Sequence, residues 1–137
     1  MRKGTFQYIE QILVDYNQTE KHIQKRINEL KYPVQIVDEN IGGGKSPFTS
    51  NVPERLAVTI ADDVLLYNLR KNHNAVKEVL ESADEEYVRV IELYYINQPR
   101  LYRWNGVAEQ TGYSEKQCRN IRNVIFDKIA EKLGMPK

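Results

Sequence analysis

Residues 104–123 read WNGVAEQTGYSEKQCRNIRN, which is the pattern of two short helices joined by a tight turn. Ala108 is a small residue suited to the place where the two helices touch, and Gly112, four residues later, allows the backbone to turn. Ser114 and Gln117 match a capping box, in which each side chain accepts a hydrogen bond from the other residue's amide. The second helix is therefore expected to begin immediately after Ser114.

The second helix of this pattern has two faces of opposite character. Cys118, Ile121 and Ile125 recur at spacings of three and four residues, so they share one side of the helix and are expected to seal it against the first. The opposite face carries cationic and amide side chains, namely Lys116, Arg119, Asn120 and Asn123, with Arg122 on the flank. Arginine suits guanine, asparagine suits adenine, and a helix N-terminus suits phosphate. The stretch therefore predicts a helix-turn-helix that reads duplex DNA in the major groove.

The candidate DNA contacts are expected to divide into two roles. Arg119 and Asn120 would specify sequence, whereas Lys116, Arg122 and Arg103 would mainly hold phosphates. The complete candidate set is Arg103, Ser114, Lys116, Gln117, Arg119, Asn120, Arg122 and Asn123. The alternative is an ordinary helical hairpin with a polar outer face. DNA binding is favoured because the turn glycine, the capped second helix, the apolar triplet and the basic face all occur together.

Charge is unevenly distributed along the chain, although the formal net charge of its 137 residues is only +1. Residues 1–51, 52–98 and 99–137 hold seven, five and eight basic residues against six, nine and four acidic ones, which gives +1, −4 and +4. A basic end is typical of a segment that binds a polyanion. The acidic stretch from Asp62 to Glu92 is either a solvated surface or a face for a protein partner.

The N-terminal segment, residues 1–31, is expected to form one long helix because it has no glycine or proline after Gly4. Apolar residues keep the alternating spacing of a coiled-coil seam, interrupted once by Glu20. The seam positions are Ile9, Leu13, Tyr16, Ile23, Ile27 and Leu30. This pattern indicates either a homodimer formed through residues 9–30 or an amphipathic helix that lies on the rest of the chain. Three heptads do not decide between these two alternatives.

Residues 32–52 are expected to be a linker, because prolines and glycines interrupt the helical pattern there. A short extended piece is expected at Val34–Val37. The sequence Gly44-Lys45-Ser46 resembles part of a phosphate-binding loop, but Glu39 stands where the first glycine of such a loop should be. A nucleotide-binding enzyme is therefore not expected.

Residues 53–137 are expected to form a helical DNA-binding domain. Its first helix would begin at Pro53 and reach at least Arg70, and whether residues 53–81 are one helix or two is left open. Ser82 and Glu85 match a second capping box, which predicts the start of another helix. That helix would end before Pro99. The residues it is expected to bury are Tyr87, Val88, Ile91 and either Tyr94 or Tyr95.

Other classes of site have little support in the sequence. Cys118 is the single cysteine and is expected to be a core residue, while His22 and His73 stand apart from other metal-ligating residues. No catalytic set of residues stands out, and no apolar run approaches the length of a membrane span. We therefore expect an all-α, non-enzymatic protein without cofactor, metal or membrane contact, located in the cytoplasm.

From Glu85 to Leu133 the sequence resembles region four of bacterial sigma factors. Residues 86–95, EYVRVIELYY, correspond to the leading helix, and residues 127–133, DKIAEKL, correspond to the closing segment. The middle of the recognition helix reads Arg119-Asn120-Ile121 where sigma factors read approximately Arg-Gln-Ile. Asn120 is therefore a departure, and the sigma regions that bind core polymerase are absent.

The whole chain is similar to the RinA and ArpU type of phage transcriptional activator. That type has a helical N-terminus, a glycine-containing linker like Asn40-Ile41-Gly42-Gly43, a segment like Ala57-Val58-Thr59, and a sigma-like C-terminus. The resemblance implies activation of late phage genes in the cytoplasm of a bacterial host cell, through binding of promoter DNA and recruitment of host RNA polymerase. A small terminase subunit, which also joins a helix-turn-helix to an oligomerising helix, is the alternative.

Overall fold

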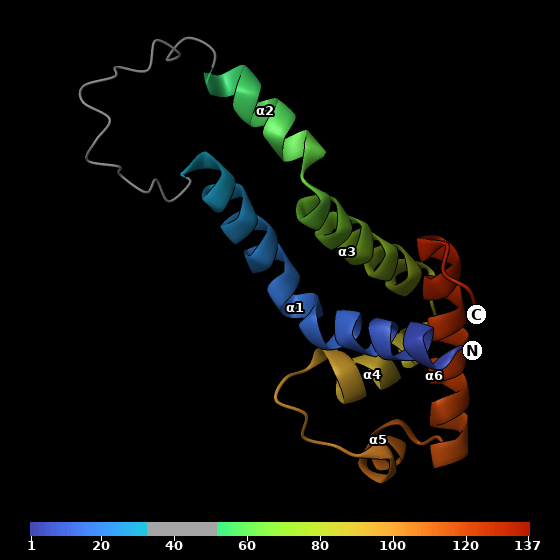
Figure 1. The fold of residues 1–137 in the computed structure, drawn as a ribbon. Helices are drawn as coiled ribbons and strands as arrows, with labels where there is room; N and C mark the ends of the chain where they lie inside the picture. The colour runs from blue at the N-terminus through green and yellow to red at the C-terminus, as the bar shows by residue number, and fades with distance from the viewer. Residues whose placement is uncertain (33–51) are drawn as a thin grey trace. The chain divides into compact units, whose positions relative to one another are not determined.

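The computed structural model describes residues 1–32 and 52–137, with side chains in the second range from residue 54 onward. In chain order the elements are α1 (Lys3–Lys31), α2 (Val52–Asp62), α3 (Val64–Ser82), α4 (Glu85–Ile91), the π-helical turn η1 (Glu92–Ile96), α5 (Trp104–Thr111) and α6 (Glu115–Leu133) (Figure 1). The described residues contain no strand, so the predicted all-α class is confirmed. The expected extended piece at Val34–Val37 and the glycine-rich segment lie outside the described residues.

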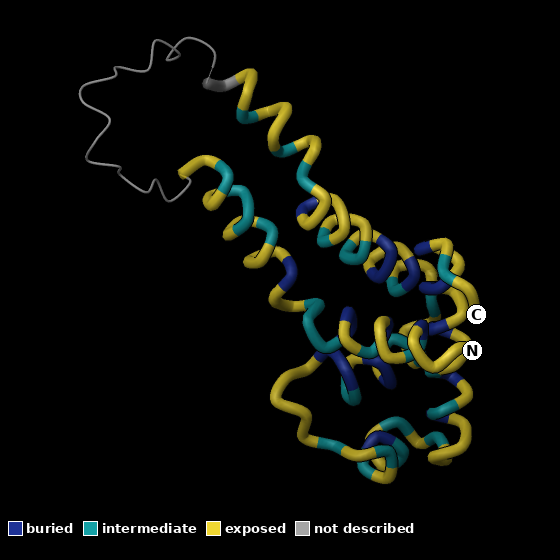
Figure 2. The backbone as a smooth tube through the Cα atoms, viewed as in Figure 1, coloured by how far each residue is buried: buried dark blue, intermediate teal, exposed yellow. Residues whose placement is uncertain are grey.

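The chain divides into two compact units. The first consists of residues 1–20 and 71–137, and the second of residues 21–70. Within each helix of the first unit, buried and exposed positions alternate along the backbone, as is typical of helices with one face on a core (Figure 2). None of the described helices combines the length and the apolar character needed to cross a membrane.

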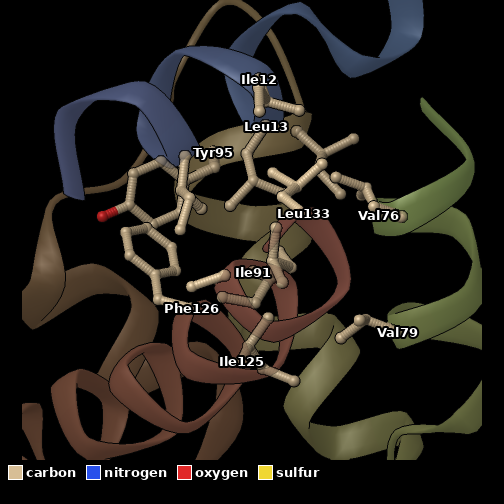
Figure 3. Close-up of a cluster of buried hydrophobic side chains, with 14 residues drawn as sticks. Ile12, Leu13, Val76, Val79, Ile91, Tyr95, Ile125, Phe126 and Leu133 are labelled. Carbon is tan, nitrogen blue, oxygen red and sulfur yellow. The ribbon is translucent and has the colours of Figure 1, made fainter. Parts of the chain in front are cut away.

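The core of the first unit brings together four segments that are distant in sequence. They are the beginning of α1, the end of α3, the stretch formed by α4 and η1, and the second half of α6 (Figure 3). Tyr95 and Phe126 are its largest fully buried side chains, and their ring centroids lie 5.5 Å apart. The buried members are Ile9, Ile12, Leu13, Ala75, Val76, Val79, Ile91, Tyr95, Ile96, Ile125, Phe126, Ile129, Ala130 and Leu133.

The apolar seam in the N-terminal part of α1 packs against other helices of the same chain. Ile9 and Leu13 are fully buried in the core of the first unit, where a second copy could not reach them without unpacking that core. Glu20, the polar position of the seam, is exposed, and its carboxylate lies 3.7 Å from Nε2 of His73. For this part of α1 the structure therefore favours the intramolecular alternative. The later seam residues are half-buried in the second unit, and dimerisation through them stays a prediction.

The helix expected to run without interruption from Pro53 to at least Arg70 is in fact two helices, and they meet at Asp63. The Asp63 carboxylate accepts a hydrogen bond of 2.8 Å from the Leu66 amide, which is how an N-cap residue starts a new helix. The same carboxylate accepts hydrogen bonds from the guanidinium of Arg26 in α1, and the shortest of them, from Nη2 to Oδ2, is 2.6 Å. These bonds hold the pKa of Asp63 below its ordinary value, first through Arg26 and then through the Leu66 amide. After this break α3 continues to Ser82.

The capping box predicted at Ser82 and Glu85 is wrong. Ser82 is the last residue of α3, and its hydroxyl donates back to the Val79 carbonyl at 3.1 Å. α4 begins at Glu85 after Asp84, which makes no side-chain cap. The apolar face of α4 also differs from the prediction: Ile91 and Tyr95 are buried as expected, but Tyr87 and Val88 are half-buried and Val90 is buried instead.

Candidate nucleic-acid interface

The turn between α5 and α6 has the geometry expected from the sequence. Gly112 adopts the left-handed conformation, with φ 80° and ψ 0°, and its amide donates to the Ala108 carbonyl at 2.9 Å. A residue other than glycine is strained in this backbone conformation. The left-handed glycine therefore ends α5 and lets the chain reach the start of α6 within two further residues.

The capping box at the start of α6 is present with both of its hydrogen bonds. The Gln117 amide donates to the Ser114 hydroxyl oxygen at 3.1 Å, and the Ser114 amide donates to Oε1 of Gln117 at 2.8 Å. Both side chains are exposed. The Ser114 hydroxyl hydrogen and the Gln117 amide hydrogens take no part in the box, so they remain available as donors to an outside acceptor.

A small second cluster of buried side chains fastens the start of α6 to the elements behind it. It consists of Val90 from α4, Val107 from α5, and Cys118 and Ile121 from α6. The Cys118 thiol is fully buried, and its sulfur lies 3.8 Å from the Thr111 hydroxyl oxygen. Ile125 is buried as predicted, but it belongs to the main core. The predicted apolar face of α6 thus spans two clusters.

The corner residue Tyr113 ties the turn to α4. Its hydroxyl donates to the Glu86 carboxylate, and this hydrogen bond is the main reason why the pKa of Tyr113 is raised to about 12. The contact joins positions that are 27 residues apart in the chain. It fixes the orientation of the α5–α6 turn on α4 from outside, while the second cluster fixes it from inside.

Aromatic stacking anchors the start of α5. The rings of Trp104 and Tyr94 are stacked, with centroids 3.8 Å apart and planes inclined by 10°. The guanidinium of Arg100 lies 4.0 Å from the centroid of the Tyr94 ring, and its Nε donates to the Tyr94 carbonyl at 2.7 Å. The sequence contained no local signal for this arrangement, because the loop that precedes α5 has to fold back onto η1 to form it.

The structure brings most of the predicted DNA contacts to the first three turns of α6. Ser114, Lys116, Gln117, Asn120 and Asn123 are exposed, and Arg119 and Arg122 are half-buried. Arg103 is also exposed, but it precedes α5 and lies outside α6. Among the described residues no carboxylate forms a salt bridge with Arg103, Lys116 or Arg119. Their charges are therefore available for an external anion. Within those same residues no group of three or more metal-ligating side chains occurs.

Arg122 differs from the other predicted cations because other side chains of the protein hold its guanidinium. Its guanidinium carbon lies 5.0 Å from the centroid of the Phe6 ring and 5.3 Å from that of Trp104. Its Nε donates to Oδ1 of Asn123 at 3.1 Å. Phe6 belongs to α1 and precedes Arg122 by more than a hundred positions, so sequence reasoning could not have found this contact.

Comparisons with known proteins give two matches. A family model described as "Protein of unknown function (DUF722)" matches residues 6–131. The chain is also similar to a protein named transcriptional activator rinA from Staphylococcus phage phi11, with 22% identity over 134 residues that cover 98% of this chain and 94% of that protein. The predicted similarity to the RinA type of activator is thereby confirmed at the level of a distant homologue. No solved structure gives a significant match. Because the family model spans nearly the whole chain, the chain belongs to the family described as "Protein of unknown function (DUF722)".

Proposed function

We propose that this protein is a sequence-specific DNA-binding transcriptional activator of phage genes and that it reads promoter DNA with the beginning of α6. The observation that carries the proposal is the two-sided character of this helix. Cys118 and Ile121 are buried behind it, while Lys116, Asn120 and Asn123 are exposed in front. A recognition helix needs this arrangement, because its inner face must be fixed while its outer face enters the major groove.

The outer face offers the chemistry that duplex DNA requires. Lys116 and Arg119 supply positive charge that no carboxylate among the described residues neutralises. Asn120 and Arg119 are side-chain types that can form paired hydrogen bonds with adenine and guanine. Lys116 and Arg103 would hold phosphates, together with the Ser114 hydroxyl and the N-terminus of α6. The proposal therefore assigns sequence specificity to Arg119 and Asn120, and affinity for DNA of any sequence to Lys116 and Arg103.

The distant relative supports activation as the biological role. Its name describes a transcriptional activator of a phage, and the similarity covers 98% of this chain. We infer that the α4–α6 region works like region four of sigma factors and that the protein recruits host RNA polymerase to late phage promoters. The relative's name also favours this role over the packaging role of a small terminase subunit.

Selection of bound duplexes from a randomised DNA library would test sequence-specific binding. The full-length protein is expected to enrich one motif. On that motif Arg119→Ala should weaken binding by about 1 to 3 kcal/mol and relax discrimination at one base pair. Lys116→Ala should weaken binding to all sequences similarly and reduce the slope of log affinity against log salt by about 1.

The matched control is Lys128→Ala, which removes an exposed lysine about 18 Å further along the same helix axis. It is expected to leave both affinity and salt slope unchanged. Failure of the wild-type protein to enrich any motif, or equal effects of the Lys116 and Lys128 substitutions, would contradict the proposed interface.

Transcription in vitro with bacterial RNA polymerase would test activation. A template that carries the enriched motif upstream of a weak promoter is expected to give more transcript when the protein is present. Arg119→Ala should abolish the increase at protein concentrations that saturate the wild type. Binding without any increase in transcript would contradict the activator role while leaving DNA recognition intact.

A further inference from the structure

Arg122 sits at the meeting point of three elements that are far apart in sequence. Its guanidinium carbon faces the rings of Phe6 in α1 and Trp104 in α5 at 5.0 and 5.3 Å from their centroids. These are cation–π distances, and such contacts favour one orientation of the side chain. The Phe6 ring is in turn packed on Phe126, with centroids 4.9 Å apart. The platform under Arg122 therefore belongs to the core of the first unit.

The buried side chain of Tyr95 also lies near Arg122. The hydroxyl of Tyr95 donates to the Glu10 carboxylate at 3.1 Å, and Tyr95 itself is fully buried. Burial raises the pKa of Tyr95, and the nearby positive charge of Arg122 acts in the opposite direction. Arg122 is thus close enough to Tyr95 to interact with it electrostatically. The neighbours of the guanidinium are therefore the Phe6 and Trp104 rings and the Tyr95 hydroxyl, which already donates to Glu10.

The orientation of Arg122 has a consequence for its neighbour on the exposed face. Arg122 Nε donates to Asn123 Oδ1 at 3.1 Å, and Asn123 is exposed. A carboxamide has one acceptor oxygen and two donor hydrogens, so a bond that engages the oxygen leaves the donor side of the group available. Asn123 then offers hydrogen-bond donors to whatever lies in front of α6.

We propose that Arg122 is a positioning residue that holds Asn123 as a hydrogen-bond donor toward an acceptor atom on a DNA base edge. This inference rests on the proposed DNA-binding function. Acceptors of this kind in the major groove are O6 and N7 of guanine, N7 of adenine and O4 of thymine. Paired recognition of adenine needs the Asn oxygen as well as its amide hydrogens. Asn123 therefore discriminates by donation, and Arg122 contributes to specificity without touching the DNA.

Specificity profiles of five variants would test the inference, with the motif enriched by the wild-type protein as the reference. Asn123→Ala should lower discrimination at one base pair about 5- to 100-fold. Arg122→Gln should lower discrimination at the same base pair, and the double variant should lose no more than Asn123→Ala alone. Arg122→Lys retains the positive charge but cannot reproduce the guanidinium geometry, so it should behave like Arg122→Gln.

The fifth variant, Phe6→Leu, removes the ring under Arg122 from a helix that we do not place on DNA. It should lower discrimination at that same base pair, while affinity for random duplex and the salt slope stay at the wild-type value. In the absence of DNA, the side-chain amide NMR signals of Asn123 should shift in Arg122→Gln, Arg122→Lys and Phe6→Leu. This readout reports on the hydrogen bond directly and needs no DNA.

The results separate this inference from the proposed function. If the wild-type protein enriches a motif but Arg122→Gln weakens all sequences equally, lowers the salt slope and is rescued by Arg122→Lys, Arg122 is a phosphate contact and the inference is overturned. Unchanged Asn123 amide signals in all three variants would overturn it as well. If the wild-type protein enriches no motif, the proposed function fails first and the inference fails with it.

Discussion

Replacement of Gly112 by alanine tests whether the α5–α6 turn depends on the left-handed backbone. Gly112 has a φ of +80°, and a Cβ atom built on it would meet no other atom within 4 Å. Steric contact with the rest of the protein therefore adds nothing, and the cost is that of the backbone conformation, about 1 to 2 kcal/mol for an L-residue. Asparagine tolerates this conformation better, so Gly112→Asn should cost less than Gly112→Ala.

Denaturant unfolding followed by circular dichroism would measure these differences as changes in the free energy of unfolding. Gly112→Ala should lower it by about 1 to 2 kcal/mol and the melting temperature by roughly 3 to 8 °C. The matched control is Gly4→Ala in the first turn of α1, where the new Cβ would also meet nothing within 4 Å. Because Gly4 lies in a helix, this substitution should be neutral or stabilise by up to about 1 kcal/mol.

Two results would contradict a requirement for left-handed backbone at Gly112. If Gly112→Ala is as stable as the wild-type protein, the turn does not require a left-handed residue at this position. If Gly112→Asn and Gly112→Ala lose equal stability, the loss does not come from backbone strain. Either result would remove the physical basis for the tight turn in front of α6.

Three further predictions concern side chains behind or away from the exposed face of α6. Cys118 should resist a thiol reagent in the native protein and react in denaturant, and Cys118→Ser should lower the free energy of unfolding by about 1 to 3 kcal/mol because a hydroxyl replaces a thiol in an apolar cluster. The pKa of Asp63 is lowered in the folded state, so the ionised carboxylate stabilises the fold above the unfolded pKa, and this stabilisation is lost as pH falls. In urea titrations from pH 5 to pH 2, the free energy of unfolding of the wild-type protein should therefore decline more than that of Asp63→Asn. The pKa of Tyr113 is raised to about 12 from 10.0, so its contribution is complete below pH 10 and is lost as pH rises toward 12. Absorbance titration at alkaline pH should show a late-ionising phenol that is missing from Tyr113→Phe.

Two capping-box patterns in the sequence had opposite outcomes in the structure. The box at Ser114 and Gln117 is formed, because Gly112 has already ended the preceding helix and leaves Ser114 in an extended conformation. The pattern at Ser82 and Glu85 is not formed, because Ser82 is still part of α3 and its hydroxyl bonds to Val79. A capping motif alone does not say whether the preceding helix has stopped. The glycine two residues before Ser114 supplied that information, and no such residue precedes Ser82.

The break at Asp63 shows the complementary limit of helical periodicity. Apolar spacing through residues 56–67 predicted one continuous helix, and nothing in the adjacent sequence contradicts it. The Asp63 carboxylate instead caps α3 and pairs with Arg26, a residue 37 positions earlier in α1. The partner that stabilises the break is therefore distant in sequence, which explains why local pattern reading missed it.

The helix-turn-helix pattern was readable from the amino-acid sequence because all its determinants are local. The left-handed glycine, the reciprocal cap and the spacing of Cys118 and Ile121 act within about fifteen residues, where chain geometry alone sets which groups meet. The environment of Arg122 was not readable, because it depends on Phe6 of α1 and Trp104 of α5 arriving at one point of α6. Contacts of that kind follow from how the helices pack, and packing reflects the shapes of all the buried side chains together.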